Sequence, residues 1–437
     1  MSNSVARMLA LALALGTAAA QAEDLRDVYR LAQESDPQLR AAEAGHRAAL
    51  EARPQSRAAL LPNVSFSAQT QWNQVEIKKP VALDKDYNTS SYALSLRQAV
   101  YHHDYYVQLR QADAGIAQAD AQYGSARQGL IVRVAETYFN LLAAEDNLRF
   151  AQAEKTAIAQ QLRQTQQRFE VGLSAITDVH EAQAGYDAAV AQEIVAQNQL
   201  QNAREVLREI TGRDHAAITP LAGEIPLQSP DPASIDQWVE TALQQNLQLL
   251  AAEAATQVAR EEMNRRQAGH YPTLDIVASH NWSDTTKSAT VSASESNSNI
   301  IGLQLNVPLY AGGGVSASTR EATHLYTQAQ EGMEQTRRST VRQTRDAYLG
   351  VTAGISTVQA RRQAVSSART ALEATQAGFD VGTRTAVEVL NSQRELFRTQ
   401  RDYARARYDY ALSTLRLKQA AGILAEADVD HINTWLK

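Results

Sequence analysis

The feature that most constrains the fold of this chain is an internal repeat with an offset of 210 residues. Residues 28–72 align without a gap on residues 238–282, and both segments end in a tryptophan. Residues of the first segment that meet an identical residue in the second include Ala32, Gln38, Leu39, Ala41, Ala42, Glu43, Ala44, Glu51, Pro62 and Ala68. A repeat of this length predicts two copies of one large structural unit rather than a solenoid of many short units.

Each copy contains a long stretch without proline. No proline occurs between Pro80 and Pro220 or after Pro308, and these stretches are rich in residues that favour helix. We expect helices over about 101–167 and 316–377, the first roughly 100 Å long at 1.5 Å per residue. Its apolar residues form two adjacent stripes, which are Ile131, Val134, Tyr138, Leu141 and Leu148, and Val132, Ala135, Phe139 and Leu142. Such a helix has a neighbour on each side, as in the wall of a tube or in an antiparallel bundle.

Each copy also contains a predicted β-hairpin, at 62–100 and at 272–310. Apolar and polar residues alternate there with a period of two, which is typical of strands with one apolar face. The apolar faces carry Phe66, Leu94, Ile276 and Leu305. The strands are long enough to cross a bilayer, although a soluble amphipathic sheet would show the same alternation. Because four strands cannot enclose a pore, membrane-spanning strands would require several copies of the chain to share one barrel.

The first 22 residues have the layout of a secretory signal peptide. Arg7 precedes an apolar run over 8–20, and Ala20-Gln21-Ala22 forms a small-residue cleavage site before Glu23. The apolar run is shorter than the roughly 20 residues that a membrane-spanning helix needs. We therefore expect an exported protein that loses residues 1–22.

Composition and local motifs argue against catalysis. The chain has no cysteine, which excludes disulfides and zinc-thiolate sites, and its 42 Lys and Arg against 48 Asp and Glu give no basic footprint for nucleic acid. His102-His103-Asp104 lacks the spacing of a metal site and is interpreted as a surface cluster. Gly312-Gly313-Gly314 lacks the residues of a phosphate loop. We predict no catalytic residues, no cofactor and no metal site.

One motif interrupts the helical stretches of both copies. It reads FEVGLSAITDV at 169–179 and FDVGTRTAVEVLN at 379–391. Glycine ends a helix by adopting the left-handed conformation, so Gly172 and Gly382 predict helix-turn-helix corners near 171–175 and 381–385. After the second corner, Thr385 and Glu388 have the spacing of a capping box.

These motifs, together with VPLYAGGG at 307–314 and GHYPTLD at 269–275, resemble the TolC family of outer-membrane channel-tunnels. The resemblance extends over residues 23–437. It implies an α-dominated membrane protein in which a homotrimer forms one 12-stranded β-barrel, with four strands from each chain, that continues into a long α-helical coiled-coil tunnel in the periplasm. It also implies a passive exit duct for tripartite efflux pumps or type I secretion, gated at its periplasmic end. The implied partners are a periplasmic adaptor protein and an inner-membrane transporter.

The resemblance further assigns roles to residues of the two corners. The adaptor-contact residues would be Val171, Gly172, Leu173, Val381, Gly382 and Thr383, although a plain helical corner explains the glycines equally well. Glu388 would line the pore constriction, where Asn391 replaces a second acid of the family pattern. Asp178 and Arg384 would form a latch between neighbouring coiled coils, with Phe379 where the family has a tyrosine. A capping role alone also accounts for Glu388.

The expected organisation is a first repeat over 23–212, a linker over 213–234, a second repeat over 235–422 and a tail over 423–437. By the same resemblance, the linker and the tail would form a belt around the middle of the tunnel. A periplasmic coiled-coil adaptor or a soluble coiled-coil scaffold is the alternative. An adaptor would have one central helical hairpin between β-rich halves, whereas this sequence predicts two helical hairpins and four short strands.

Overall fold

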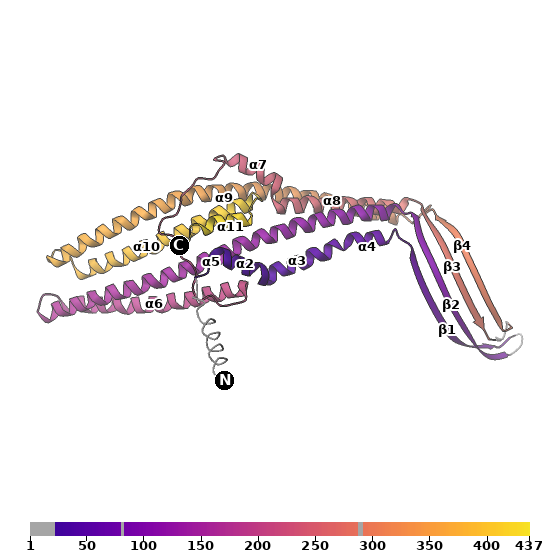
Figure 1. The fold of residues 1–437 in the computed structure, drawn as a ribbon, viewed down its shortest axis with the longest axis horizontal. Coiled ribbons are helices and arrows are strands. Elements are labelled where there is room, and N and C mark those ends of the chain that lie inside the picture. The colour runs from indigo at the N-terminus through magenta and orange to yellow at the C-terminus, as the bar shows by residue number, and fades with distance from the viewer. Residues whose placement is uncertain (1–21, 80–82, 287–291) are drawn as a thin grey trace, which may run out of the picture. The chain divides into compact units, whose positions relative to one another are not determined.

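The computed structural model describes residues 22–79, 83–286 and 292–437 (Figure 1). Apart from Ala22, the predicted signal peptide lies outside these residues. The described chain divides into two compact units. Unit 1 contains the residues up to Glu43 together with Tyr123–Leu247 and Arg337–Lys437, and unit 2 contains Ala44–Gln122 and Gln248–Thr336.

The order of elements in the first half of the chain recurs in the second. The first half contains α2 (Leu25–Ser35), α3 (Pro37–Leu50), α4 (Ala52–Ala58), β1 (Asn63–Ile77), β2 (Leu83–Tyr101), α5 (His103–Glu170) and α6 (Ile176–Thr211). The second contains α7 (Ile235–Gln245), α8 (Leu247–Gln267), the 3₁₀ turn η1 (Ala268–His270), β3 (Thr273–Thr285), β4 (Ser294–Asn306), α9 (Gly314–Asp380) and α10 (Ala386–Ala420), and α11 (Glu426–Asn433) follows. The predicted long helices are confirmed, since α5 has 68 residues and α9 has 67.

No helix among the described residues contains an apolar stretch that is long enough to cross a membrane.

The helical segments that precede the hairpins are interrupted at Asp36 and Glu51 in the first half of the chain and at Asn246 in the second. The sequence predicts largely helical segments over about 24–60 and 235–268, and within them α2 ends before Asp36 and α7 ends before Asn246. The Asp36 carboxylate accepts hydrogen bonds from the backbone N–H groups of Gln38 and Leu39, and it also pairs with Arg133 of α5. Its side chain therefore caps α3, which begins at Pro37, where a missing N–H costs nothing.

Unit 2 contains a four-stranded antiparallel sheet in the order β1-β2-β3-β4 (Figure 1). The register pairs Phe66 with Leu94, Tyr92 with Trp282 and Ile276 with Leu303. Residues that are directly opposite share a face, so most apolar residues of the four strands lie on one side of the sheet, while Val277 and Ile300 lie on the other. That side is uncovered in the single chain, because Phe66 is 69% exposed and Leu303 is 72% exposed.

The predicted surface cluster at 102–104 is wrong for His102, which is only 5% exposed. Its imidazole lies 3.1 Å from a carboxylate oxygen of Asp275 on β3 and stacks on Tyr105, with 4.4 Å between the ring centroids. The guanidinium of Arg97 donates a second hydrogen bond to Asp275 at 2.8 Å. Because Asp275 is itself buried, these two partners compensate for the loss of water around its charge. Within the described residues, no group of three or more His, Cys, Asp or Glu side chains is placed to hold a metal ion.

The core of unit 1 forms where the middle of α5 packs against α2, α6 and α10. Both predicted stripes of α5 lie in it, with Tyr138 and Phe139 fully buried. The Tyr138 hydroxyl donates to the Thr219 carbonyl at 2.7 Å, and burial raises the pKa of this phenol. The ring of Phe139 stacks on Tyr408 of α10, whose hydroxyl donates to Asp146 at 2.7 Å. Each buried hydroxyl thus has a partner that offsets its desolvation.

The predicted linker and tail lie against each other in unit 1. Ala222 donates its backbone N–H to the Trp435 carbonyl at 2.8 Å, and Lys437 donates to the Pro220 carbonyl at 2.9 Å. On its other side the linker pairs with the residues that precede α2, because Ile218 forms a parallel bridge with Glu23. Three segments that are far apart in the sequence are therefore joined by backbone hydrogen bonds.

Candidate functional site at the helix-turn-helix tips

Two tight corners connect the paired long helices of unit 1. The turn at 171–175 joins α5 to α6, and the turn at 381–385 joins α9 to α10; we call these turns tip 1 and tip 2 (Figure 1). Gly172 and Gly382 have φ angles of 77° and 81°. The residue after each glycine donates back to the helix, from Leu173 N–H to the Arg168 carbonyl at 2.7 Å and from Thr383 N–H to the Gly378 carbonyl at 2.8 Å. These bonds satisfy carbonyls at the helix ends and explain the requirement for glycine.

The adaptor-contact residues predicted from the sequence lie at the ends of these turns. Val171 is 69% exposed and Val381 is 76% exposed, and Leu173 is similarly uncovered. A Cβ atom added to Gly172 or Gly382 would meet no atom within 4 Å, so the space above each glycine is open. Each tip therefore presents apolar side chains around an accessible stretch of backbone, a surface that suits contact with another protein.

Tip 2 contains a capping box, as the sequence predicts. The backbone N–H of Thr385 donates to a carboxylate oxygen of Glu388 at 2.8 Å, and the Glu388 N–H donates to the Thr385 hydroxyl at 3.3 Å. Arg384 donates to the other carboxylate oxygen at 2.5 Å. The hydrogen bond from the Thr385 backbone, followed by that from Arg384, holds the pKa of Glu388 below its usual value. Glu388 is therefore ionised at neutral pH and paired with a cation of its own chain.

Glu388 and Asn391 lie one turn apart on α10 and so share a face of this helix. Asn391 is exposed and Glu388 is partly exposed, whereas the neighbouring Val389 and Leu390 are buried against the chain. Both predicted constriction residues thus point away from the core of their own chain. This face can contribute to the lining of a space that lies outside a single chain.

Asp178 has a more limited role at tip 1. One of its carboxylate oxygens accepts a hydrogen bond from the Ala175 N–H at 3.3 Å at the start of α6. Alanine at this position offers no side-chain oxygen, so only half of a capping box forms here. Of the two predicted latch partners, Asp178 caps its own helix and Arg384 pairs with Glu388.

The direct contact between the tips involves Arg168, to which the sequence analysis gave no role. Its guanidinium lies over the ring of Phe379, 4.4 Å from the centroid, and also donates to the Phe379 carbonyl at 3.4 Å. Phe379 is 7% exposed and packs against Ala386 and Val389. The sequence predicted Phe379 as the latch residue that lacks a hydroxyl. In the structure its ring stacks against the guanidinium of an arginine from the other helical hairpin.

A second contact holds the two helical hairpins together behind the tips. Leu390 of α10 packs with Ile158 of α5 and Ala189 of α6. A Cβ atom at Gly185 would lie 2.8 Å from the Leu390 side chain, so α6 and α10 approach each other closely at this level. The small residues of α6 therefore allow this approach.

A comparison with protein families decides the identity of this fold. The sequence model described as "Outer membrane efflux protein" matches residues 28–213 and again residues 238–423. The chain belongs to the outer membrane efflux protein family. Like other members of this family, the protein resides in the outer membrane, and its helices extend into the periplasm.

Individual relatives agree with this assignment. The chain is 42% identical to the outer membrane protein TolC of Vibrio cholerae over 433 residues, which is 98% of each chain. It is 32% identical to the alkaline protease secretion protein AprF of Pseudomonas aeruginosa, over 93% of this chain and 86% of that one. The crystal structure of the Campylobacter jejuni CmeC outer membrane channel shares the fold, with a TM-score of 0.79 at 16% identity over 94% of this chain and 90% of the other.

These relatives are outer-membrane channel proteins rather than enzymes, and the chain is accordingly an outer-membrane efflux channel protein. The alternative of a periplasmic adaptor or scaffold is not supported. The two family matches begin 210 residues apart, at the offset seen in the sequence.

Proposed function

We propose that three copies of this outer-membrane efflux protein assemble into a passive channel-tunnel that is gated at tips 1 and 2. In this assembly each chain supplies four strands to one 12-stranded β-barrel, and the long helices form a coiled-coil tunnel in the periplasm. The observation that carries the proposal is the sheet of unit 2. It combines an exposed apolar face with two outer strands that, in the part of the chain that the structure describes, have a partner on one side and none on the other.

The edges of this sheet favour self-association. β1 has 15 residues and β4 has 13, and among the described residues each pairs with one neighbouring strand. Unpaired edges of this length expose rows of N–H and C=O groups, which are costly in lipid. Pairing of β1 in one copy with β4 in the next removes every edge once the ring closes. Three copies supply enough strands to enclose a pore, whereas a single copy does not.

The two halves of each chain would act as structural repeats. Their order of elements agrees, and the family model matches each half once. Three copies then provide six similar helical hairpins around one axis. The linker at 213–234 and the tail at 423–437 would form a belt on this wall, in keeping with their mutual hydrogen bonds.

The narrowest part of the gate would lie at tip 2. Three copies of Glu388 facing a common axis form a ring of carboxylates that attracts cations. Arg384 donates to Glu388 within the chain, so the ring carries less uncompensated charge than its acids alone suggest. Asn391 in place of an acid weakens the ring further. Arg384 can also exchange Glu388 for Asp178 of a neighbouring copy, and either pair is weak enough, at about 1 kcal/mol for an exposed ion pair, to be replaced by contacts with a partner.

The partners would be a periplasmic adaptor that docks on the exposed tip residues and an inner-membrane transporter that supplies the energy. The relatives suggest two kinds of cargo. The description of the family model names efflux, and the name of AprF refers to secretion of an alkaline protease. We propose that this protein serves efflux, type I protein secretion, or both.

Disulfide trapping tests the assembly and the latch together. The chain has no native cysteine, so a double variant with Asp178→Cys and Arg384→Cys contains only the two introduced thiols. Oxidation of the membrane-embedded protein should give covalent dimers and trimers on a non-reducing gel. It should also lower single-channel conductance, and a reductant should restore the original value. Each single variant serves as a control and should give no covalent trimer. A double variant that forms only an internal disulfide would overturn the latch between copies.

A further inference from the structure

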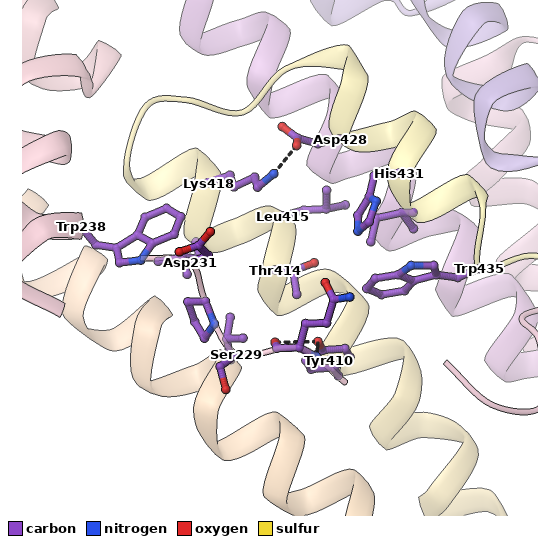
Figure 2. A pocket seen from close by; sticks show the side chains of 15 residues that line it. Ser229, Asp231, Trp238, Tyr410, Thr414, Leu415, Lys418, Asp428, His431 and Trp435 are labelled. Atoms are coloured by element: carbon purple, nitrogen blue, oxygen red, sulfur yellow. Dashed lines mark hydrogen bonds and ion pairs between the residues drawn. The ribbon is translucent and has the colours of Figure 1, made fainter. Parts of the chain in front are cut away.

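Unit 1 contains a cavity that the channel function does not use. Its volume is about 320 Å³, and it lies where the segment 228–231 crosses α10 beside α11 (Figure 2). This volume is within the range of small-molecule sites. The cavity is distinct from tips 1 and 2 and from the sheet, since its walls come from the linker, α7, α9, α10, α11 and the residues after α11.

Three aromatic rings line the cavity. Trp238 extends from α7, Tyr410 from α10, and Trp435 from the segment after α11 (Figure 2). Tyr410 and Trp435 are stacked, with 6.0 Å between centroids and 6° between their planes. Trp238, Tyr410 and Trp435 are only 4%, 1% and 6% exposed, so packing fixes their positions and only small parts of the rings reach the cavity. Fixed aromatic rings are a favourable surface for an apolar ligand or an organic cation.

Most polar groups of the cavity already have partners. The Tyr410 hydroxyl accepts from the Gln228 N–H at 2.9 Å and donates to the Gln228 carbonyl at 3.0 Å. The Trp238 indole N–H donates to the Pro232 carbonyl at 2.8 Å, and the Lys418 ammonium pairs with Asp428. These interactions leave little capacity to recognise an anion or a neutral hydrogen-bonding ligand.

Two groups at the rim differ from the rest. Asp231 is exposed and has no hydrogen bond or ion pair with any described residue. His431 is also exposed, and its ring contacts the edge of Trp435 at 5.5 Å between centroids. Since Lys418 and Asp428 pair with each other, Asp231 is the carboxylate of the lining that has no ion pair with a described residue.

We propose that this cavity binds a monovalent organic cation with an apolar body, of the quaternary ammonium class. The aromatic walls hold the apolar body and face the cationic centre, and the carboxylate of Asp231 supplies the opposite charge at the rim. The site is outside the proposed conduit and does not depend on the gate. A ligand in this site is bound among the helices of unit 1 and is not being transported through the channel.

Isothermal titration calorimetry of the full-length protein in detergent tests the proposal, with benzyltrimethylammonium as the probe and empty micelles as the blank. N,N-dimethylbenzamide, a neutral aromatic compound of similar size, is the uncharged control ligand and should bind more weakly than the cation. Asp231→Asn should weaken binding of the cation about tenfold, through the loss of one charge at contact distance. Glu240→Gln removes an exposed carboxylate of α7 that does not line the cavity, and it should leave the affinity unchanged.

A third variant, His431→Lys, places a positive charge at the rim and should also weaken binding of the cation. All three substitutions are at exposed positions, so the variants should fold like the unmodified protein. The proposal is overturned by an absence of saturable binding, by equal affinity for the cation and the amide, or by an unchanged affinity in Asp231→Asn.

Discussion

Replacing Arg168 by alanine should open the periplasmic end of the channel, because this residue joins the two helical hairpins of each chain. The substitution removes a guanidinium that lies 4.4 Å from the centroid of the Phe379 ring and donates to the Phe379 carbonyl at 3.4 Å. A cation over an aromatic ring contributes about 0.5–2 kcal/mol, with the larger values in desolvated sites. The hydrogen bond is long, so we assign it no more than about 0.5 kcal/mol.

These contributions add to about 0.5–2.5 kcal/mol per chain, which corresponds to a shift of roughly 2- to 70-fold in the balance between joined and separated tips. Single-channel recording in planar bilayers should therefore show a higher mean conductance for Arg168→Ala than for the unmodified protein. Arg168→Lys keeps the charge but loses the planar face that stacks on Phe379, so an intermediate conductance is expected.

Arg163→Ala is the matched control, since Arg163 is an exposed arginine on the same helix, five residues earlier. It should conduct like the unmodified protein. If Arg168→Ala and Arg163→Ala give the same conductance as the unmodified channel, the contact between Arg168 and Phe379 does not hold the tips together.

Three further predictions concern single residues of unit 1. Gly422→Ala should prevent stable folding, seen as loss of a cooperative thermal transition, because the new Cβ would lie 2.1 Å from the Gln245 carbonyl oxygen. Gly172 has open space around it, so Gly172→Ala should cost only about 1–2 kcal/mol of stability and lower the transition temperature by a few degrees. Arg384→Ala should raise single-channel conductance, and an unchanged value would count against a latch. The lowered pKa of Glu388 should keep this carboxylate charged below the usual titration range of glutamate. Cation selectivity, measured as reversal potential, should therefore persist in mild acid and disappear only as the pH falls through the depressed pKa. The stability that the charged carboxylate contributes should be lost over the same fall in pH.

Local sequence patterns were sufficient for the elements that depend on nearby residues. The alternation at 64–72 predicted a strand with one apolar face, and the structure places Phe66 and Trp72 exposed on β1. Thr385 and Glu388 predicted a capping box, which forms between atoms only three residues apart. These interactions are readable because their partners lie within one turn or one strand.

Interactions between distant segments could not be read in this way. The ion pair between Asp36 and Arg133 joins α5 to the start of α3, and the side chain of Asn246, where α7 ends, donates to the Ala420 carbonyl at 2.9 Å. Burial of His102 likewise depends on Asp275, which lies 173 residues later. No local pattern records that these residues meet, since packing of separate helices and strands brings them together.

The role of Arg168 illustrates the same limit at the candidate site. The resemblance to the TolC family drew attention to Phe379 through a missing hydroxyl, whereas the structure shows a ring that supports a guanidinium. One signal was present in the sequence, because Arg168 corresponds to Gly378 in the second copy. This difference between two otherwise similar motifs falls where a side chain of the first half of the chain, Arg168, contacts the second half at Phe379.

The central claim, that the protein is a cation-attracting channel with Glu388 in its lumen, is tested most directly by ion selectivity. Purified protein is inserted into a planar bilayer under a salt gradient, without any partner or energy source, and the reversal potential is recorded. We predict conductance steps of uniform size with cation selectivity, and a reduced selectivity in Glu388→Gln. An absence of conductance steps would contradict the channel, and anion selectivity would contradict the position of Glu388 in the lumen.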